Sequence, residues 1–423
     1  MPHPPLHTLN GNAIVSRIRV TPSFSDNGLG DVAMPARQRP RWHMRKIIAL
    51  VVLASVLGCG SLGLACSSAG TSSGGSPPGA SSGASGTSGT SGASGGEGGA
   101  AGAIPTGTFL YVSRVTDKQH VLMAYDSTNG ETRVVTDLRG DGSEGWTIDG
   151  FSISPDRTRI VMASLYGPTK ADVDTGLSSQ RLWSFAADGS DYRRLTPVWQ
   201  NSGGGRTGWN VQVRNPMFTL SGTDVIYGYG EYWYEGTTLK GGSDLWVVSG
   251  AGGGVPSYPQ SPVTCSRVAP SVDPKTGKVA VLHSVCAGSQ AGIYLYAPDG
   301  SGTPEPLVVD SNALSTSLEA PRWVGDGSVF VFIGVTPVTV NGSTRNGQGL
   351  FAFDMASRTP SAVVVPEEPD TSVVDATIAP DGRALVYCLR KGDAQDLHLI
   401  DLTKTPATDT AITKDGKSCH AVW

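Results

Sequence analysis

The sequence predicts an all-β fold, a six-bladed β-propeller of four-stranded blades that occupies residues 105–423. Three observations predict it. One phrase, an apolar stretch, a tight turn and a second apolar stretch, occurs five times at intervals of about fifty residues, which is a period typical of propellers and solenoids. A second phrase follows each of these and supplies two more strands. The last residues of the chain form a strand-like segment without a turn of its own.

The tight turns are built on Pro-Asp-Gly or close relatives of it. They lie at residues 153–156, 219–222, 273–277, 324–327 and 379–382. Proline presets φ for the second turn position, aspartate tolerates the third, and glycine accepts the positive φ that leads back into a strand. The runs that follow, such as Ile160–Ala163 and Val329–Phe332, have the length and the β-branched or aromatic content of strands. Because these runs are apolar throughout, we expect both faces of each strand to be buried between neighbouring blades.

The second phrase is clearest at Arg181–Phe185, which is followed by the turn Ala187–Gly189 and the strand end Arg194–Pro197. The same phrase also precedes the first hairpin, so the first blade lacks an inner strand. The segment Cys419–Trp423 aligns with Glu319–Trp323, the inner strand of a later blade. We therefore expect the C-terminal strand to pair into the first blade, which closes the ring and removes the sheet edges.

These phrases resemble the repeats of the TolB-type propeller family over about residues 107–423. The turn Ser154-Pro155-Asp156 and the strand end Arg194-Leu195-Thr196-Pro197 match most closely. The resemblance implies a TolB-like propeller. It does not imply TolB's partners, because we expect no counterpart here of the α/β domain that precedes the propeller of TolB. Similar repeats also build the propellers of prolyl oligopeptidases and of some polysaccharide lyases.

Residues 44–66 have the layout of a lipoprotein-type secretory signal, with basic residues at Met44–Lys46, an apolar run and then small residues with cysteines. We expect the lipid on Cys66, which leaves a signal of usual length, and Cys59 is the alternative because Val56 stands three places before it. An uncleaved anchor or a plain secretory signal remains open. Residues 1–43 form an unpatterned leader, and we expect translation to begin at Met44.

Residues 67–104 form a linker made almost entirely of Ser, Gly, Ala and Thr. Such a segment cannot bury enough apolar surface to fold and behaves as a flexible coil. We expect an exported monomer that is held to a membrane of the cell envelope by its lipid. The residue after either candidate cysteine is not aspartate, which by family analogy favours the outer membrane, with the propeller on the periplasmic or the surface face.

Charge and cysteine content restrict the partners and the cofactors. The net charge is −4 and the pI is about 6.0, so the chain has no basic field for nucleic acid. Cys265 and Cys286 flank one hairpin symmetrically, and Cys388 ends a strand where the strand of Cys419 begins. In an exported chain these positions favour two disulfides, with buried free thiols as the alternative. No Cys-x-x-Cys pair or histidine cluster occurs, so we predict no metal and no cofactor.

Long connections follow the second and fourth strands of the blades and share one face of a propeller. They are residues 139–147, 167–180, 199–210, 228–243 and 335–349. We expect binding on this face, because recognition usually lies on loops held by a rigid scaffold. The candidate residues are Trp199, Arg206, Trp209, Glu231, Tyr232, Trp233, Tyr234 and Glu235. Aromatics beside carboxylates suit a sugar ring or a protein partner, and the alternative is that they pack onto their own blade.

Aligned inner strands predict a ring of polar residues at the mouth of the central channel. Asp149, Arg214 and Glu319 share one position, and Asn215, Asp375 and His420 share the next. This ring could hold a polar ligand or a cation, or could be a solvated, self-paired ring. Scattered histidines and the absence of a nucleophile with a recognisable partner favour a non-catalytic protein that binds an envelope protein or glycan. The alternative is a polysaccharide lyase or hydrolase with its active site at the channel mouth.

Overall fold

A computed structural model of the chain describes residues 103–423 except for short gaps. The gaps are residues 117–118, 137–147, 165–179, 198–206, 262–264, 287–290, 310–319, 341–342, 367, 369 and 405–406. The predicted leader, signal segment and linker lie outside the described residues. Within the described part, no helix has the length and apolarity that a membrane span requires.

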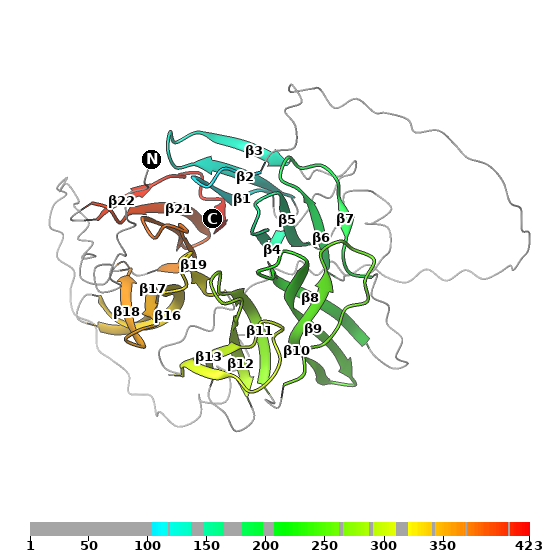
Figure 1. Cartoon of the computed structure of the whole chain (residues 1–423). Coiled ribbons are helices and arrows are strands. Elements are labelled where there is room, and N and C mark those ends of the chain that lie inside the picture. Colours follow the sequence, from blue (N-terminus) through cyan, green and yellow to red (C-terminus); the bar gives the residue numbers. More distant parts are fainter. Residues whose placement is uncertain are drawn as a thin grey trace, which may run out of the picture. The chain divides into compact units, whose positions relative to one another are not determined.

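The described residues form antiparallel sheets, one for each blade, and the sheets are arranged around a ring (Figure 1). Blade 1 holds β23 (Ser418–Val422), β1 (Thr108–Thr116), β2 (Gln119–Asp126) and β3 (Thr132–Thr136), from the channel outward. Blade 2 holds β4 (Ile148–Ile153), β5 (Arg159–Ser164), β6 (Arg181–Ala186) and β7 (Arg193–Arg194). Blade 3 holds β8 (Thr207–Phe218), β9 (Asp224–Glu235) and β10 (Thr238–Ser249).

The other three blades follow the same order. Blade 4 holds β11 (Cys265–Val272), β12 (Val279–Cys286), β13 (Gly292–Tyr296) and β14 (Glu305–Val308). Blade 5 holds β15 (Arg322–Trp323), β16 (Val329–Val340), β17 (Ser343–Asp354) and β18 (Thr359–Val364). Blade 6 holds β19 (Thr371–Ile378), β20 (Ala384–Lys391), β21 (Ala394–Asp401) and β22 (Thr408–Ala411).

The predicted six-bladed propeller is confirmed, with one difference of detail in blade 3. Its sheet has three strands among the described residues. An isolated bridge between Val247 and Ser257 takes the place of the fourth strand. The segment that makes this bridge is rich in glycine and proline, from Gly252 to Pro259. Such residues cannot extend a ladder far, because proline lacks a donor and glycine loses most entropy on ordering.

The core lies between the blades, as the continuous apolar runs predict. In β5, Ile160 and Met162 pack with residues of blade 1, whereas Val161 and Ala163 pack with residues of blade 3. All four side chains are fully buried. Because side chains alternate across a strand, each middle strand contributes to two interfaces at once, and every blade depends on both of its neighbours.

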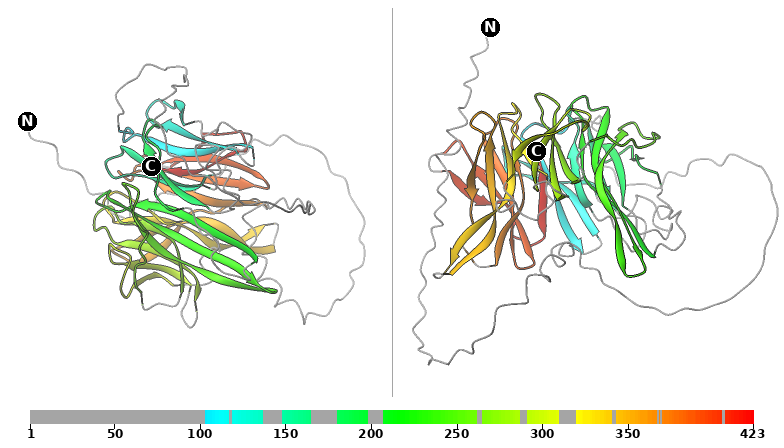
Figure 2. Two further views of the ribbon diagram at one scale, coloured as in Figure 1. Left: turned by 90° about the vertical axis from the view of Figure 1, so that its right-hand side faces the viewer. Right: turned by 90° about the horizontal axis from the view of Figure 1, so that it is seen from below.

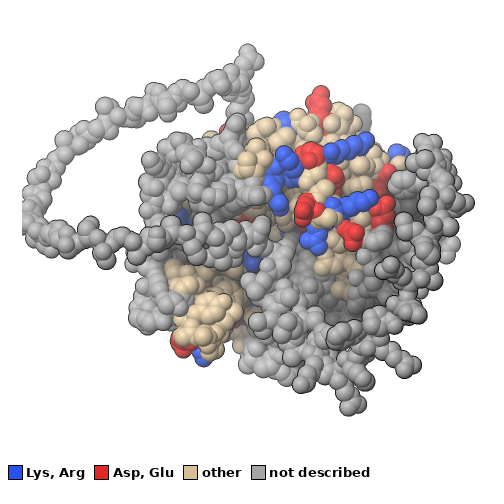
Figure 3. Space-filling view, turned by 180° about the vertical axis from the view of Figure 1, so that it is seen from behind, with Lys and Arg blue, Asp and Glu red and all other residues tan. Residues whose placement is uncertain are grey.

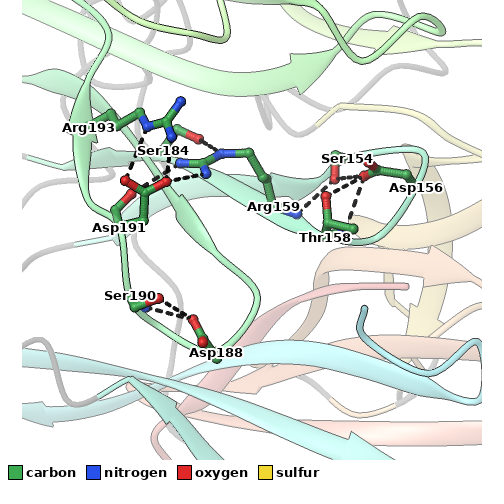
Figure 4. A network of polar contacts seen from close by, with 9 residues as sticks. All are labelled: Ser154, Asp156, Thr158, Arg159, Ser184, Asp188, Ser190, Asp191 and Arg193. Carbon is green, nitrogen blue, oxygen red and sulfur yellow. Dashed lines mark hydrogen bonds and ion pairs between the residues drawn. The ribbon is translucent and has the colours of Figure 1, made fainter. Parts of the chain in front are cut away.

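The aspartates of the tight turns serve the turns themselves (Figure 4). Asp156 Oδ1 accepts hydrogen bonds from Ser154 Oγ at 2.6 Å and from Thr158 Oγ1 at 2.9 Å. These bonds hold the pKa of Asp156 below its usual range. In the same way, Asp188 Oδ1 accepts a hydrogen bond from Ser190 Oγ at 2.6 Å. The turn carboxylates are therefore structural groups with occupied oxygens.

A charged network also fastens the outer edge of blade 2 (Figure 4). Arg159 on β5 donates to Ser184 Oγ on β6 at 3.0 Å and pairs with Asp191 at 2.8 Å. Asp191 also pairs with Arg193 on β7 at 2.6 Å. Arg159 thus links three strands through their side chains, and its charge is neutralised within the blade.

The ring is closed as the sequence predicts. The last strand, β23, pairs with β1 through Leu110 opposite Val422 and Val112 opposite Cys419. A disulfide joins Cys388 of blade 6 to Cys419 of β23, which confirms the predicted second bridge. Cys265 and Cys286 are paired in register on β11 and β12, as predicted. A bridge between them stays a prediction, because their side chains lie outside the described part.

Removing the Cys388–Cys419 disulfide should destabilise the propeller. The bridge spans 31 residues, and the loss of a cross-link of that span frees chain entropy in the unfolded state worth about 3–4 kcal/mol. We expect the Cys388→Ala/Cys419→Ala variant to unfold at a lower urea concentration than the oxidised wild type. Equal urea midpoints would show that the bridge contributes nothing to ring closure.

Candidate functional site

Two long hairpins extend from the same side of the ring (Figure 2). The strands β9 and β10 have 12 residues each, as do β16 and β17. The prediction that residues 228–243 and 335–349 are loops is therefore wrong. The first of these segments pairs continuously from Gly228 opposite Leu245 to Glu235 opposite Thr238. The face that we expected to carry flexible loops carries rigid two-stranded arms.

The glycines of residues 228–243 indicated a loop in the sequence, and the structure shows why glycine is needed in this hairpin. Gly241 has a φ of 104°, and a Cβ at this position would lie 1.8 Å from the carbonyl oxygen of Glu231 on the paired strand. Only glycine allows the two backbones to approach so closely. A segment rich in glycine thus forms a strand, because tyrosine and tryptophan at the neighbouring positions favour the sheet.

The aromatics of the hairpin divide into two groups. Tyr229 is buried and lies 4.6 Å from Trp246, ring centroid to ring centroid. Trp209 on β8 is partly buried, and its Nε1 donates to Glu231 Oε1 at 2.9 Å. These residues pack onto their own blade, which was the alternative left open above. Tyr232 is partly buried and its hydroxyl bonds to Ser243 Oγ.

The tip of the hairpin is exposed. Tyr234 is 44% exposed and stands directly opposite Leu239, which is 53% exposed. Next to them, Trp233 Nε1 donates to Glu235 Oε1 at 3.1 Å, which limits the rotation of the indole. Trp199 and Arg206 lie outside the described residues. The tip therefore presents an exposed apolar pair on one face of the hairpin, and the Trp233 indole lies on the other face.

The channel mouth opens on the same face, and β-bulges shape it. The register of the innermost strand slips between Ile148 and Gly150 in β4 and between Arg214 and Met217 in β8. Bulges re-aim side chains and occur often beside functional sites. Asn215 and His420 occupy equivalent positions and have positive φ angles of 47° and 53°. Such conformations cost about 1–3 kcal/mol each in residues other than glycine, so the closed ring must hold them.

The structure brings most of the predicted channel ring together. His420 Nδ1 lies 3.5 Å from Asp375 Oδ2, and Asp375 is buried. Asp149 is close enough to Arg214 and His420 for both to act on its charge. Glu319 lies outside the described residues. The mixed charges are therefore partly paired with one another, and each remains next to the channel.

The sequence analysis missed one member of this site, Gln180. Its Nε2 donates to Asp149 Oδ2 at 2.6 Å, and its Oε1 accepts from the backbone N–H of Val213 at 2.7 Å. The amide thus ties Asp149 of blade 2 to the innermost strand of blade 3. Gln180 precedes β6 at the end of a long connection, a position that the alignment of inner strands does not cover.

Asp149 has a strongly perturbed acidity. Desolvation raises its pKa from 3.8 to about 6, against the opposing effects of Arg214, His420 and the bond from Gln180. Asp149 is nevertheless exposed by its accessible surface, so water screens much of the effect on stability. A carboxyl that titrates near neutrality beside a histidine can exchange a proton or bind a polar ligand. Among the described residues no group of acidic, histidine or cysteine side chains is arranged to hold a metal ion.

Comparisons with known proteins concern the fold alone. No protein-family model and no curated protein matches the sequence. Among solved structures, TolB from Acinetobacter baumannii matches at 14% identity and a TM-score of 0.48, over 75% of this chain and 66% of that chain. Kuenenia stuttgartiensis hydrazine synthase matches at 11% identity and a TM-score of 0.50, over 75% of this chain and 46% of that chain.

An oligogalacturonate lyase from Vibrio parahaemolyticus matches at 14% identity and a TM-score of 0.40, over 67% of this chain and 72% of that chain. This chain thus spans just under two thirds of TolB and less than half of hydrazine synthase. TolB is thus among the proteins that the chain matches, together with proteins of quite different names. A fold hosts unrelated activities, so the function has to be argued from the site.

The raised pKa of Asp149 predicts a pH dependence of stability. The native carboxyl keeps its proton up to about pH 6, whereas the unfolded chain releases it near 3.8. The native state therefore binds more protons in this window, and its stability falls as the pH rises through it. We expect the Asp149→Asn variant to lack this fall in melting temperature and to be at least as stable as the wild type at pH 7.

The matched control for this experiment is Asp393→Asn, an exposed aspartate in the turn between β20 and β21. It should leave the pH profile of the melting temperature unchanged. If the Asp149→Asn variant follows the wild-type profile, the pKa of Asp149 is not raised in the native protein.

Proposed function

We propose that this protein is a non-catalytic binding propeller of the cell envelope, and that it takes a protein or glycan partner on the face with the two long hairpins. The observation that carries the proposal is the tip of the β9–β10 hairpin. Exposed Tyr234 and Leu239 stand opposite each other there, on twelve-residue strands paired along their full length. A rigid strand pair loses little entropy when a partner binds.

The chemistry of the tip suits either class of partner. Tyrosine and tryptophan provide large, amphipathic contact areas and are enriched where binding energy concentrates. The faces of such rings also stack on sugars, and the neighbouring carboxylates of Glu231 and Glu235 accept hydrogen bonds from hydroxyl groups. In the structure both carboxylates accept from indoles of the same blade, Glu231 from Trp209 on β8 and Glu235 from Trp233 on β9. We infer that they act first by positioning Trp209 and Trp233.

The charged side chains described on this side of the ring suit a partner that is neutral or carries charges of both signs. Positive and negative side chains are interspersed in the coloured part of the surface seen from behind (Figure 3). Next to the β20–β21 turn, Lys391 pairs with Glu368 at 2.6 Å. A surface without a field of one sign does not attract nucleic acid over a distance. We therefore infer that the partner is recognised through direct contacts on this face and not through long-range electrostatic attraction.

The envelope location rests on the sequence before the propeller. A basic, apolar and small-residue segment at 44–66 suits export, and Cys66 suits lipid attachment. A coil of the length of the linker spans on the order of 30 Å, which holds the ring clear of a lipid surface. The resemblance of the repeats to the TolB-type family supports the same location.

A second candidate function is a polysaccharide lyase or hydrolase at the channel mouth. The observation that favours it is the perturbed acidity of Asp149 next to His420. Incubation of neutral and acidic polysaccharides with the protein would distinguish this enzyme from a binding protein. Release of reducing ends by the wild type, with loss of this activity in Asp149→Asn, would favour the enzyme over the binding protein.

Truncation of the hairpin tip should weaken partner binding. We expect the Tyr234→Ala/Leu239→Ser variant to lose about tenfold or more in affinity, since an interface tyrosine contributes about 2 kcal/mol when it is a central contact. The measurement is a glycan array and a pull-down from an envelope extract, each followed by a titration with the partner found. The control is Val255→Ser, an exposed residue in the connection after β10. Equal affinity of the wild type and the tip variant would remove the hairpin from the binding site.

The site of lipid attachment can be tested separately. Metabolic labelling with a fatty-acid probe should vanish in the Cys66→Ala variant, because this variant lacks the thiol that we expect to carry the lipid. Labelling that persists in this variant and disappears in Cys59→Ala would move the anchor to Cys59. Absence of labelling in the wild type would contradict a lipoprotein.

A further inference from the structure

A buried arginine lies inside the central channel, below the mouth. Arg322 is on β15, the innermost strand of blade 5, and is 9% exposed. Its Nη1 lies 3.3 Å from Sδ of Met217, which is on β8, the innermost strand of blade 3. Blade 4 stands between these two blades in the ring. The guanidinium therefore reaches across the channel.

Arg322 has no carboxylate partner among the residues that the structure describes. The thioether of Met217 is a weak acceptor, and the buried Nε of Arg322 has no hydrogen-bond partner in the described part. Another buried arginine, Arg267, shows what a satisfied site looks like in this fold. It pairs with Asp244 and donates to the carbonyl oxygens of Pro259 at 2.6 Å and Gly300 at 3.0 Å.

The difference between the two arginines has an energetic meaning. A guanidinium stays charged in a protein, so Arg322 carries its positive charge into the buried site. A buried charge without a counter-charge is strongly destabilising. The fold nevertheless places this charge on the innermost strand of blade 5, at the inner side of the closed ring.

The layer of the channel around Arg322 has the composition of an anion site. The equivalent positions of the other innermost strands are Ser152, Met217, Ser271, Thr377 and Val422, as the register of each strand with its neighbour shows. None of them is acidic. The hydroxyls of Ser152 and Ser271 are buried and have no hydrogen-bond partner among the described residues. The layer thus offers one cation and two donors.

We propose that Arg322 is the centre of an anion-binding site in the channel, and that the site takes a carboxylate group. The planar fork of a guanidinium matches the two oxygens of a carboxylate, and the hydroxyls of Ser152 and Ser271 add neutral donors from the innermost strands of blades 2 and 4. The carboxylate comes either from a small free acid or from the end of a larger molecule that enters the channel. The site is independent of the hairpin tip.

The test is a calorimetric titration of the full-length protein with sodium acetate, in HEPES buffer without chloride. We expect saturable binding by the wild type and an affinity about tenfold or more lower in Arg322→Met, which removes a charge-assisted hydrogen bond. Arg322→Lys keeps the charge without the fork and should retain part of the affinity. The control Arg383→Gln removes an exposed arginine and should bind acetate like the wild type.

The outcomes that overturn the proposal are equally definite. Absence of saturable binding by the wild type would do so, and so would wild-type affinity in Arg322→Met. Methionine fills a similar volume, and loss of an unpaired buried charge should not lower the melting temperature in acetate-free buffer. If Arg322→Met does not fold, unchanged affinity in both Arg322→Lys and Ser271→Ala overturns the site.

A second titration distinguishes a small free acid from the end of a larger molecule as the source of the carboxylate. Triglycine carries a terminal carboxylate, and triglycine amide lacks it. Tighter binding of triglycine than of acetate, lost on amidation, would assign the site to the end of a larger molecule. Equal or weaker binding of triglycine would assign it to a small free acid.

Discussion

Every blade of this protein needs a neighbour on each side, and the rest of the structure depends on that constraint. The middle strands are apolar on both faces, so that adjacent residues of β5 pack into opposite interfaces. A row of such blades would leave two large apolar faces in water. Closure through β23 and β1 removes both faces, and the core at this junction includes Phe109, Val386 and Cys419. The strained backbone at Asn215 and His420 is tolerated because the ring around it cannot relax.

The same constraint divides the surface into two kinds of face. On the side of the tight turns, aspartates such as Asp156 have their oxygens occupied by hydrogen bonds of the turn itself. On the opposite side the connections are free to lengthen without disturbing the core. Two of them have become twelve-residue hairpins, and the channel mouth between the blades gathers Asp149, Arg214 and His420. The candidate binding groups therefore lie on the face whose connections can lengthen without disturbing the core.

The sequence was sufficient to predict the parts that repetition governs. Alignment of the tight turns predicted the inner strands, the closure by β23, the disulfide of Cys388 with Cys419 and the shared positions of the channel ring. It failed where one blade departs from the others. The glycines of residues 228–243 indicated a loop, although Gly241 serves the close approach of β10 to Glu231. Blade 3 also lacks a regular fourth strand, since glycine and proline follow β10.

Two members of the channel could not be predicted from repetition, and for the same reason. Gln180 acts through contacts with Asp149 and Val213 that come from a connection outside the aligned strands. Arg322 occupies a position that is a serine, threonine or apolar residue in the other blades. Its direction depends on where the facing blade stands, because it extends to Met217 two blades away. Distances across a ring are a property of the closed assembly, and no local pattern contains them.

The pairing of β23 with β1 has a consequence for the order of events during synthesis. The first blade to leave the ribosome is completed by the last strand of the chain. Until that strand appears, blade 1 has an open edge and an uncovered flank, and the cooperative ring cannot form. The Cys388–Cys419 bond can likewise form only after the final residues have been synthesised. Folding of this propeller is therefore timed by its own C-terminus.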